Sequence, residues 1–183
     1  MPIHHLRSRL VAARDALDGK LHPSRKARAS TRLAELAPES VLFLCLGNVC
    51  RSPYGARVLA ERLPGVRVDS AGFIGPDRAP PELAQDVARA RGVDHADHCS
   101  KTLTPELLAA TDVVFLFDRG NVRRLRRFGG MPPGRVFRLG DFDPVWTGKR
   151  AIIDPWGKPR EEFDRTFGRI ERCVEEVARA LEG

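Results

Sequence analysis

Five consecutive apolar residues, 41 to 45, run directly into a loop that contains Gly47 and Asn48. A continuous apolar run of this length is typical of a strand buried on both faces of a parallel sheet. Ser52 and Pro53 follow the loop, and these residue types favour the N-cap and the first helical position. The sequence therefore predicts a buried strand, a tight loop and a helix in direct succession.

The rest of the chain after this unit alternates between strand and helix patterns. Hydrophobic periodicity predicts further strands at 66–69, 112–117 and 135–139 and helices at 81–91, 104–110 and 119–128. A last amphipathic helix is predicted from an apolar stripe at helical spacing: Phe163, Phe167, Ile170, Cys173, Val174, Val177 and Leu181. Alternating strands and helices imply an α/β fold, with a parallel sheet covered by helices on both faces.

Residues 1–39 are expected to form a basic helical extension before a main domain at 40–183. Apolar spacing predicts one helix near 4–20 and a second at 24–36. Residues 1–40 contain eight Lys or Arg against four Asp or Glu, out of a net charge of +7 for the chain. The extension is either a docking arm for an acidic partner, a partly ordered tail or a helical cap on the main domain, and the last two are favoured over the arm.

The composition points to a reducing, cytoplasmic setting. Four cysteines in 183 residues do not form the pattern of a disulfide framework. The first 20 residues lack the apolar stretch of a signal peptide, and the longest apolar runs are too short to cross a bilayer, so no membrane insertion is expected. The excess of basic charge favours acidic partners in general without naming one. The oligomeric state stays open.

The loop from Cys45 to Ser52 has the composition of an oxyanion site. Gly47 and Asn48 tolerate left-handed backbone angles, so successive N–H groups can point inward and form an anion nest. The following helix adds the positive end of its dipole, and Arg51 adds a planar cation that matches two phosphate oxygens. The same field favours the thiolate of Cys45, to which Ser52 can donate a hydrogen bond. Such a nucleophile needs no metal and no cofactor.

Residues 41–53 resemble the signature of the low-molecular-weight protein tyrosine phosphatase family. The resemblance covers about residues 40–182 and continues at Asp69-Ser70-Ala71-Gly72, His98, Ser100-Lys101, Asp118, Asn121 and Asp154-Pro155-Trp156-Gly157. It implies a four-stranded parallel sheet with helices on both faces. It also implies hydrolysis of protein phosphotyrosine through a phosphocysteine intermediate.

The resemblance assigns a role to each residue of the site. It makes Cys45 the nucleophile, Arg51 the phosphate clamp, Ser52 the partner of the thiolate and Asp154 the general acid. The remaining loop residues would bind phosphate: Leu46, Gly47, Asn48, Val49 and Cys50. Ser70 and His98 would hold Asn48 in a strained conformation.

Several assignments have competitors. Asp143 also precedes a proline and is the second candidate for the general acid, although Asp154 is preferred. Cys50 is either a redox partner that forms a reversible disulfide with Cys45, as in the family, or a small buried side chain. A zinc site on these two cysteines is disfavoured, because Cys99 and Cys173 are isolated and are expected in the core.

The substrate is the least determined feature. Val49 favours phosphotyrosine, because related arginine phosphatases have threonine at this position. Trp156 and Phe73 are candidates for an aromatic slot that takes the phenyl ring, with Phe73 the weaker of the two. Arginine phosphatase activity and arsenate reduction with a small thiol are the enzymatic alternatives. A basic adaptor for phosphoprotein or nucleic acid is disfavoured, since the catalytic set is intact, and the basic cluster at 119–127 is expected to be a solvated helix face.

Overall fold

The computed structural model describes residues 15–183, and the predicted helix near 4–20 therefore lies partly outside the described residues. Residues 15–20 are helical, and a turn at Leu21 leads into α2 (His22–Leu36). The elements that follow are β1 (Ser40–Cys45), α3 (Arg51–Arg62), β2 (Arg67–Gly72), α4 (Glu82–Ala90), α5 (Pro105–Ala109), β3 (Val113–Leu116), α6 (Arg119–Phe128), β4 (Val136–Arg138) and α7 (Arg160–Glu182). Two short 3-10 turns, η1 (Pro133–Arg135) and η2 (Leu139–Asp141), flank β4.

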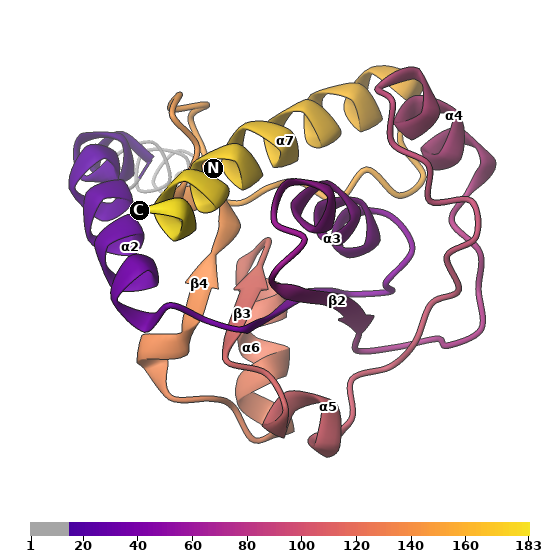
Figure 1. Ribbon diagram of the computed structural model, residues 1–183. Coiled ribbons are helices and arrows are strands. Elements are labelled where there is room, and N and C mark those ends of the chain that lie inside the picture. Colours follow the sequence, from indigo (N-terminus) through magenta and orange to yellow (C-terminus); the bar gives the residue numbers. More distant parts are fainter. Residues whose placement is uncertain (1–14) are drawn as a thin grey trace, which may run out of the picture.

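The four strands form one parallel sheet in the order β2-β1-β3-β4. Alternate residues of β1 enter different cores because side chains of a strand point to opposite faces. Val41 and Phe43 pack in the larger cluster with α3 and α7, whereas Leu42 and Leu44 pack in the smaller cluster with residues of α5 and α6. Figure 1 shows α7 and α3 on one side of the sheet and α5 and α6 on the other. The predicted α/β fold is confirmed.

Strand β2 extends beyond its predicted range. It continues through Ser70, Ala71 and Gly72, and Gly72 pairs with Cys45 at the end of β1. Ser, Ala and Gly have low strand propensity, so the pattern of apolar residues gave no signal there. A Cβ added to Gly72 would lie 2.9 Å from the backbone nitrogen of Asn48. The contact with the loop after β1 therefore requires glycine at this position.

Helix α2 packs against α7 and contributes to the larger core. Leu33 is completely buried and Ala29 nearly so, and Lys26 forms an ion pair of 2.5 Å with Glu176 of α7. His22 is buried and its Nε2 lies 2.7 Å from the carbonyl oxygen of Asp143. The described part of the extension thus lies on the main domain as a cap.

Candidate functional site

Cys45 is the last residue of β1, at the carboxyl edge of the sheet where α/β proteins bind ligands. Its side chain is 3% exposed and its Sγ lies 3.1 Å from the hydroxyl oxygen of Ser52. Helix α3 begins at Arg51, and its N-cap position is Cys50 rather than Ser52. The predicted cap was wrong, because the hydroxyl of Ser52 is engaged by Cys45 and by the amide of Asn48 at 2.9 Å.

The backbone of the loop curls around the position above Cys45. Its carbonyl oxygens are held from outside: Leu46 accepts from Phe73 N–H at 2.8 Å, Gly47 from Arg78 at 2.8 Å, and the oxygen of Asn48 lies 2.8 Å from His98 Nε2. Within the described part of the chain, the N–H groups of residues 47 to 50 donate to no protein acceptor. Together with the N-terminus of α3, they form a ready site for an oxyanion.

Asn48 holds the curl in place. It is fully buried with a φ of 52°, in the left-handed region. Its amide nitrogen donates to Ser70 Oγ at 2.9 Å, and its amide oxygen accepts from the N–H of Lys101 at 2.9 Å. The structure thus brings Ser70 and His98 into contact with Asn48. Burial lowers the pKa of His98 below its usual range, although its contact with the Asn48 carbonyl opposes this.

Arg51 is buried at the start of α3 and contacts two carboxylates. Its side chain is 1% exposed, and its guanidinium donates to Asp118 at 2.7 Å, to Asp154 at 2.5 Å and to the carbonyl of Ile152 at 3.1 Å. Burial disfavours the charged form of Arg51. The charges of Cys45, Asp154 and Asp118 outweigh this effect and raise the pKa of the guanidinium.

A pocket of about 200 Å³ opens directly over Cys45. Its lining combines the loop with Ile74, Arg78, Asp154 and Trp156. Trp156 is 56% exposed at the rim, where an aromatic group of a ligand can stack on it. Phe73, which we expected in the slot, packs instead against the smaller core, and the next residue, Ile74, lines the pocket.

Asp143 is separated from this pocket. It is completely buried and pairs with Arg169 at 2.8 Å and with Arg172 at 3.3 Å. Asp154, by contrast, lines the pocket and has a side chain that is 39% exposed. This geometry favours Asp154 over Asp143 as the group that exchanges protons with a ligand.

The other cysteines differ in burial. Cys50 is buried beside Cys45 in the pocket lining, and both are free thiols. Burial is the main cause that raises the pKa of Cys50 far above its usual value. Cys173 is buried as expected, but Cys99 is exposed, contrary to our prediction. Among residues 15–183, no group of three or more His, Cys, Asp or Glu side chains is arranged to hold a metal ion.

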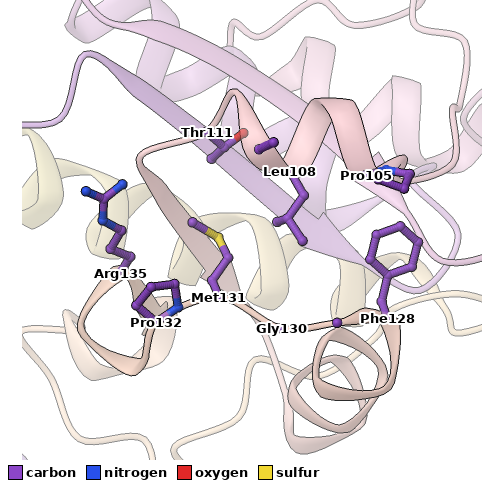
Figure 2. Close-up of a pocket in the computed structure, with 10 residues that line it drawn as sticks. Pro105, Leu108, Thr111, Phe128, Gly130, Met131, Pro132 and Arg135 are labelled. Atoms are coloured by element: carbon purple, nitrogen blue, oxygen red, sulfur yellow. The ribbon is translucent and has the colours of Figure 1, made fainter.

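A second hollow lies at the opposite edge of the sheet, where β3 and β4 begin. Figure 2 shows Leu108, Phe128 and Met131 around this groove between α5 and the end of α6. Its lining contains no cysteine, histidine or carboxylate, so its one hydroxyl group, on Thr111, has no general base or acid beside it. The pocket over Cys45 is therefore the candidate active site.

The family model of the low-molecular-weight phosphotyrosine protein phosphatases matches residues 40–183. The chain belongs to this family. It is 33% identical over 150 residues to the low molecular weight protein-tyrosine-phosphatase Etp of Escherichia coli K12, covering 81% of this chain and 99% of that protein.

Solved structures of the family have the same fold. The crystal structure of the Erwinia amylovora tyrosine phosphatase AmsI superposes with a TM-score of 0.73 at 28% identity, covering 80% of this chain and 95% of that one. The arginine phosphatase YwlE of Geobacillus stearothermophilus gives 0.68 at 30% identity, covering 79% and 94%. The predicted family and the four-stranded architecture are confirmed, and residues 1–39 lie outside the family match.

Three residues of the site carry contacts that sequence reasoning did not assign. Asp118 follows β3 at the same edge of the sheet as Cys45, and this position was a usable signal for its contact with Arg51. Ile74 and Arg78 come from the connection after β2, whose path the sequence does not specify. Arg78 donates to the carbonyls of Gly47, Ile74 and Gly75 and so ties this connection to the loop.

Proposed function

We propose that this protein hydrolyses phosphotyrosine in proteins through a covalent phosphocysteine. The observation that carries the proposal is the pocket over Cys45, which a nucleophile and the carboxyl group of Asp154 both line, with the buried guanidinium of Arg51 bonded to that carboxyl group. The sulfur of Cys45 attacks phosphorus, and the bond from phosphorus to the phenolic oxygen breaks. The backbone N–H groups of the loop and Arg51 stabilise the equatorial oxygens as charge shifts onto them.

Asp154 supplies the proton transfers in both steps. In the first step its carboxylic acid protonates the departing phenolate, because an unprotonated phenolate is a poor leaving group. In the second step the resulting carboxylate accepts a proton from water, and the water oxygen attacks phosphorus. Cys45 leaves as thiolate, stabilised by the hydroxyl of Ser52, and inorganic phosphate is released. Ser70 and His98 act through Asn48 and keep the loop curled.

Two side chains in the pocket support an aryl substrate. Val49 is an apolar part of the lining, and exposed Trp156 at the rim offers a face for a phenyl ring. Arginine phosphatase activity is the second candidate, because the Geobacillus arginine phosphatase has the same fold at 30% identity. Val49 disfavours it, since an apolar side chain gives the polar guanidinium of phosphoarginine no hydrogen-bond partner.

The deciding experiment compares phosphotyrosine peptide, phosphoarginine and arsenate with a small thiol on one preparation. We expect kcat/KM to be highest for phosphotyrosine peptide by at least about tenfold, the size of one lost polar contact. A higher value for phosphoarginine, or turnover only with arsenate and thiol, would contradict the proposal. Activity should persist in a chelator, because Arg51 and the loop supply the charge stabilisation.

We further propose a reducing, cytoplasmic setting, because the reaction requires the free thiol that Cys45 has in this structure. Among residues 15–183, no helix has the length and hydropathy needed to cross a membrane. We also propose that residues 40–183 form the phosphatase domain and residues 1–39 a basic helical extension. Cys50 is proposed to form a reversible disulfide with Cys45 under oxidation, supported by its place beside Cys45 in the pocket lining.

A further inference from the structure

A cavity of about 350 Å³ lies between the extension and the phosphatase domain, distinct from the Cys45 pocket. Helix α2 forms one wall with Ala29 and Arg32, and α6 forms another with Val122, Leu125 and Arg126. The floor is β4, which is the edge strand of the sheet. Residues of α2, α6 and β4 thus line the cavity together.

Four arginines converge on this cavity: Arg32, Arg126, Arg138 and Arg150. Its lining contains one carboxylate, Asp141, which is engaged by both nitrogens of the Arg150 fork. One negative charge against four positive charges leaves the lining with an excess of three positive charges. The field inside the cavity therefore favours an anion.

Arg138 is a partly buried cation of the cavity whose charge has no hydrogen-bonded partner among residues 15–183. Its side chain is half-buried, and within residues 15–183 it makes no hydrogen bond and no ion pair. Burial and the neighbouring charge of Arg150 lower its pKa, which shows that its positive charge is disfavoured where it lies. A bound anion would compensate the buried charge of Arg138 and its repulsion by Arg150.

The remaining surface of the cavity is apolar and shaped by fixed side chains. Leu116, Val122, Val136 and Phe137 contribute to it, and the guanidinium of Arg32 lies 4.4 Å from the centre of the Phe137 ring. A largely apolar cavity with a few convergent charged groups is the usual form of a small-molecule site. An inorganic ion would leave this apolar surface unused.

We propose that this cavity binds a small organic anion with an apolar body, with Arg138 as the principal contact of the anionic group and Phe137 and its apolar neighbours contacting the body. The cavity shares no lining residue with the Cys45 pocket, although Arg150 and Asp154 belong to the same connection before α7.

The test is isothermal titration calorimetry of the whole chain with 2-naphthoate, compared with neutral 2-naphthol and with sodium acetate. We expect 2-naphthoate to bind more tightly than either, because only it satisfies both the charge and the apolar surface. Arg138→Met should weaken its binding about tenfold or more, the size of a lost charged contact. Arg124→Met is the matched control, since this arginine is exposed on α6 and does not line the cavity.

Hydrolysis of p-nitrophenyl phosphate reports whether Arg138→Met is folded. If that variant fails to fold, Arg126→Glu replaces it, because Arg126 is exposed at the rim and reversing its charge should also weaken 2-naphthoate. Absence of 2-naphthoate binding at millimolar concentration would overturn the proposal. So would equal affinity in the folded cavity variant and in Arg124→Met, or acetate binding as tightly as 2-naphthoate.

Discussion

The two loops that meet over the pocket are held in different ways. The cysteine loop, residues 45–52, lies between β1 and α3, which are adjacent in the sequence, and Ser52 returns to contact Cys45. The acid loop, residues 149–157, has no strand or helix of its own. Side chains from α3 and α7 hold it, at Ile152 and at Ala151 respectively.

Arg169 of α7 is the main anchor of the acid loop. It donates to the carbonyls of Lys149 at 2.6 Å and Ala151 at 2.8 Å while it pairs with buried Asp143. The carbonyl of Asp143 in turn contacts His22 of the extension. The comparison shows that the nucleophile lies where two sequence-adjacent elements meet, with distant residues such as Ser70 and His98 holding the curl of its loop. The proposed general acid lies in a loop that has no strand or helix of its own and depends on contacts between distant elements.

Removing the nucleophile is the strongest way to test the cysteine loop. Cys45→Ser should lower kcat for p-nitrophenyl phosphate by about 10⁵-fold or more, because no other group can form the covalent intermediate. Phosphate binding, measured by calorimetry, should persist since the backbone nest is unchanged. Cys99→Ser, at an exposed cysteine, is the control that should keep full activity. Substantial turnover in Cys45→Ser would refute the mechanism.

Replacing Asp154 tests the acid loop and leaves the cysteine loop unchanged. Asp154→Asn is expected to lower kcat for phenyl phosphate by about 10²- to 10⁴-fold, the usual contribution of general acid catalysis. The loss should be smaller for p-nitrophenyl phosphate, whose leaving group needs little protonation. Rates for a series of aryl phosphates provide the measurement. An equal loss across the series would argue against Asp154 as the acid.

Removing the hydrogen bonds from Arg169 to the acid loop should lower activity with the same leaving-group dependence as Asp154→Asn, but by less. Arg169→Met leaves Asp143 buried with weaker compensation, so we expect a loss of about 3 kcal/mol in the free energy of unfolding. We also expect kcat to fall more for phenyl phosphate than for p-nitrophenyl phosphate. Arg172→Met is the control, because Arg172 also pairs with Asp143 but makes no hydrogen bond to the acid loop. If both variants show the same leaving-group dependence, Arg169 has no specific positioning role.

The smallest effect concerns two histidines on the cysteine-loop side. Burial lowers the pKa of His95 to about 4 from its usual 6.5, and it lowers that of His98 as well. Well above pH 6.5, His95 is neutral in the folded and in the unfolded protein. Below pH 6.5, His95 becomes protonated in the unfolded protein but stays neutral in the folded protein until about pH 4. His95 should therefore cost about 2 kcal/mol of stability between pH 6.5 and 5, at about 1.4 kcal/mol for each pH unit.

Urea unfolding at pH 7 and pH 5 measures this loss. Asp112, whose pKa is lowered by its hydrogen bonds to Ser40, loses its contribution to stability as the pH falls below its usual value of 3.8, which lies outside this window. His95→Phe should reduce the pH dependence, because the ring lies among Tyr54 and Phe167 and phenylalanine cannot be protonated. An unchanged difference between pH 7 and pH 5 in this variant would contradict the assignment.

The sequence by itself determined the family and the cysteine loop. The apolar run of β1, the residues that tolerate left-handed angles and the start of α3 are neighbours in the chain. Local propensity and periodicity therefore predicted their succession, although α3 begins at Arg51 rather than after an N-cap at Ser52. Helix α6 was predicted over the same residues that the structure shows, because its apolar spacing is regular. The sequence did not predict the end of β2, because Ser70, Ala71 and Gly72 carry no apolar pattern. Gly72 is required there by its close contact with the cysteine loop.

Only the tertiary structure decided which acidic residues contact Arg51. It also decided that Ile74, and not Phe73, lines the pocket, and where the extension lies on the sheet and helices. Asp118 and Asp154 are 67 and 103 positions from Arg51, and no periodic pattern encodes a contact across such distances. The same holds for the arginines that α2, α6 and β4 bring to one cavity. Packing of buried surfaces fixes these contacts, and packing depends on the whole chain at once.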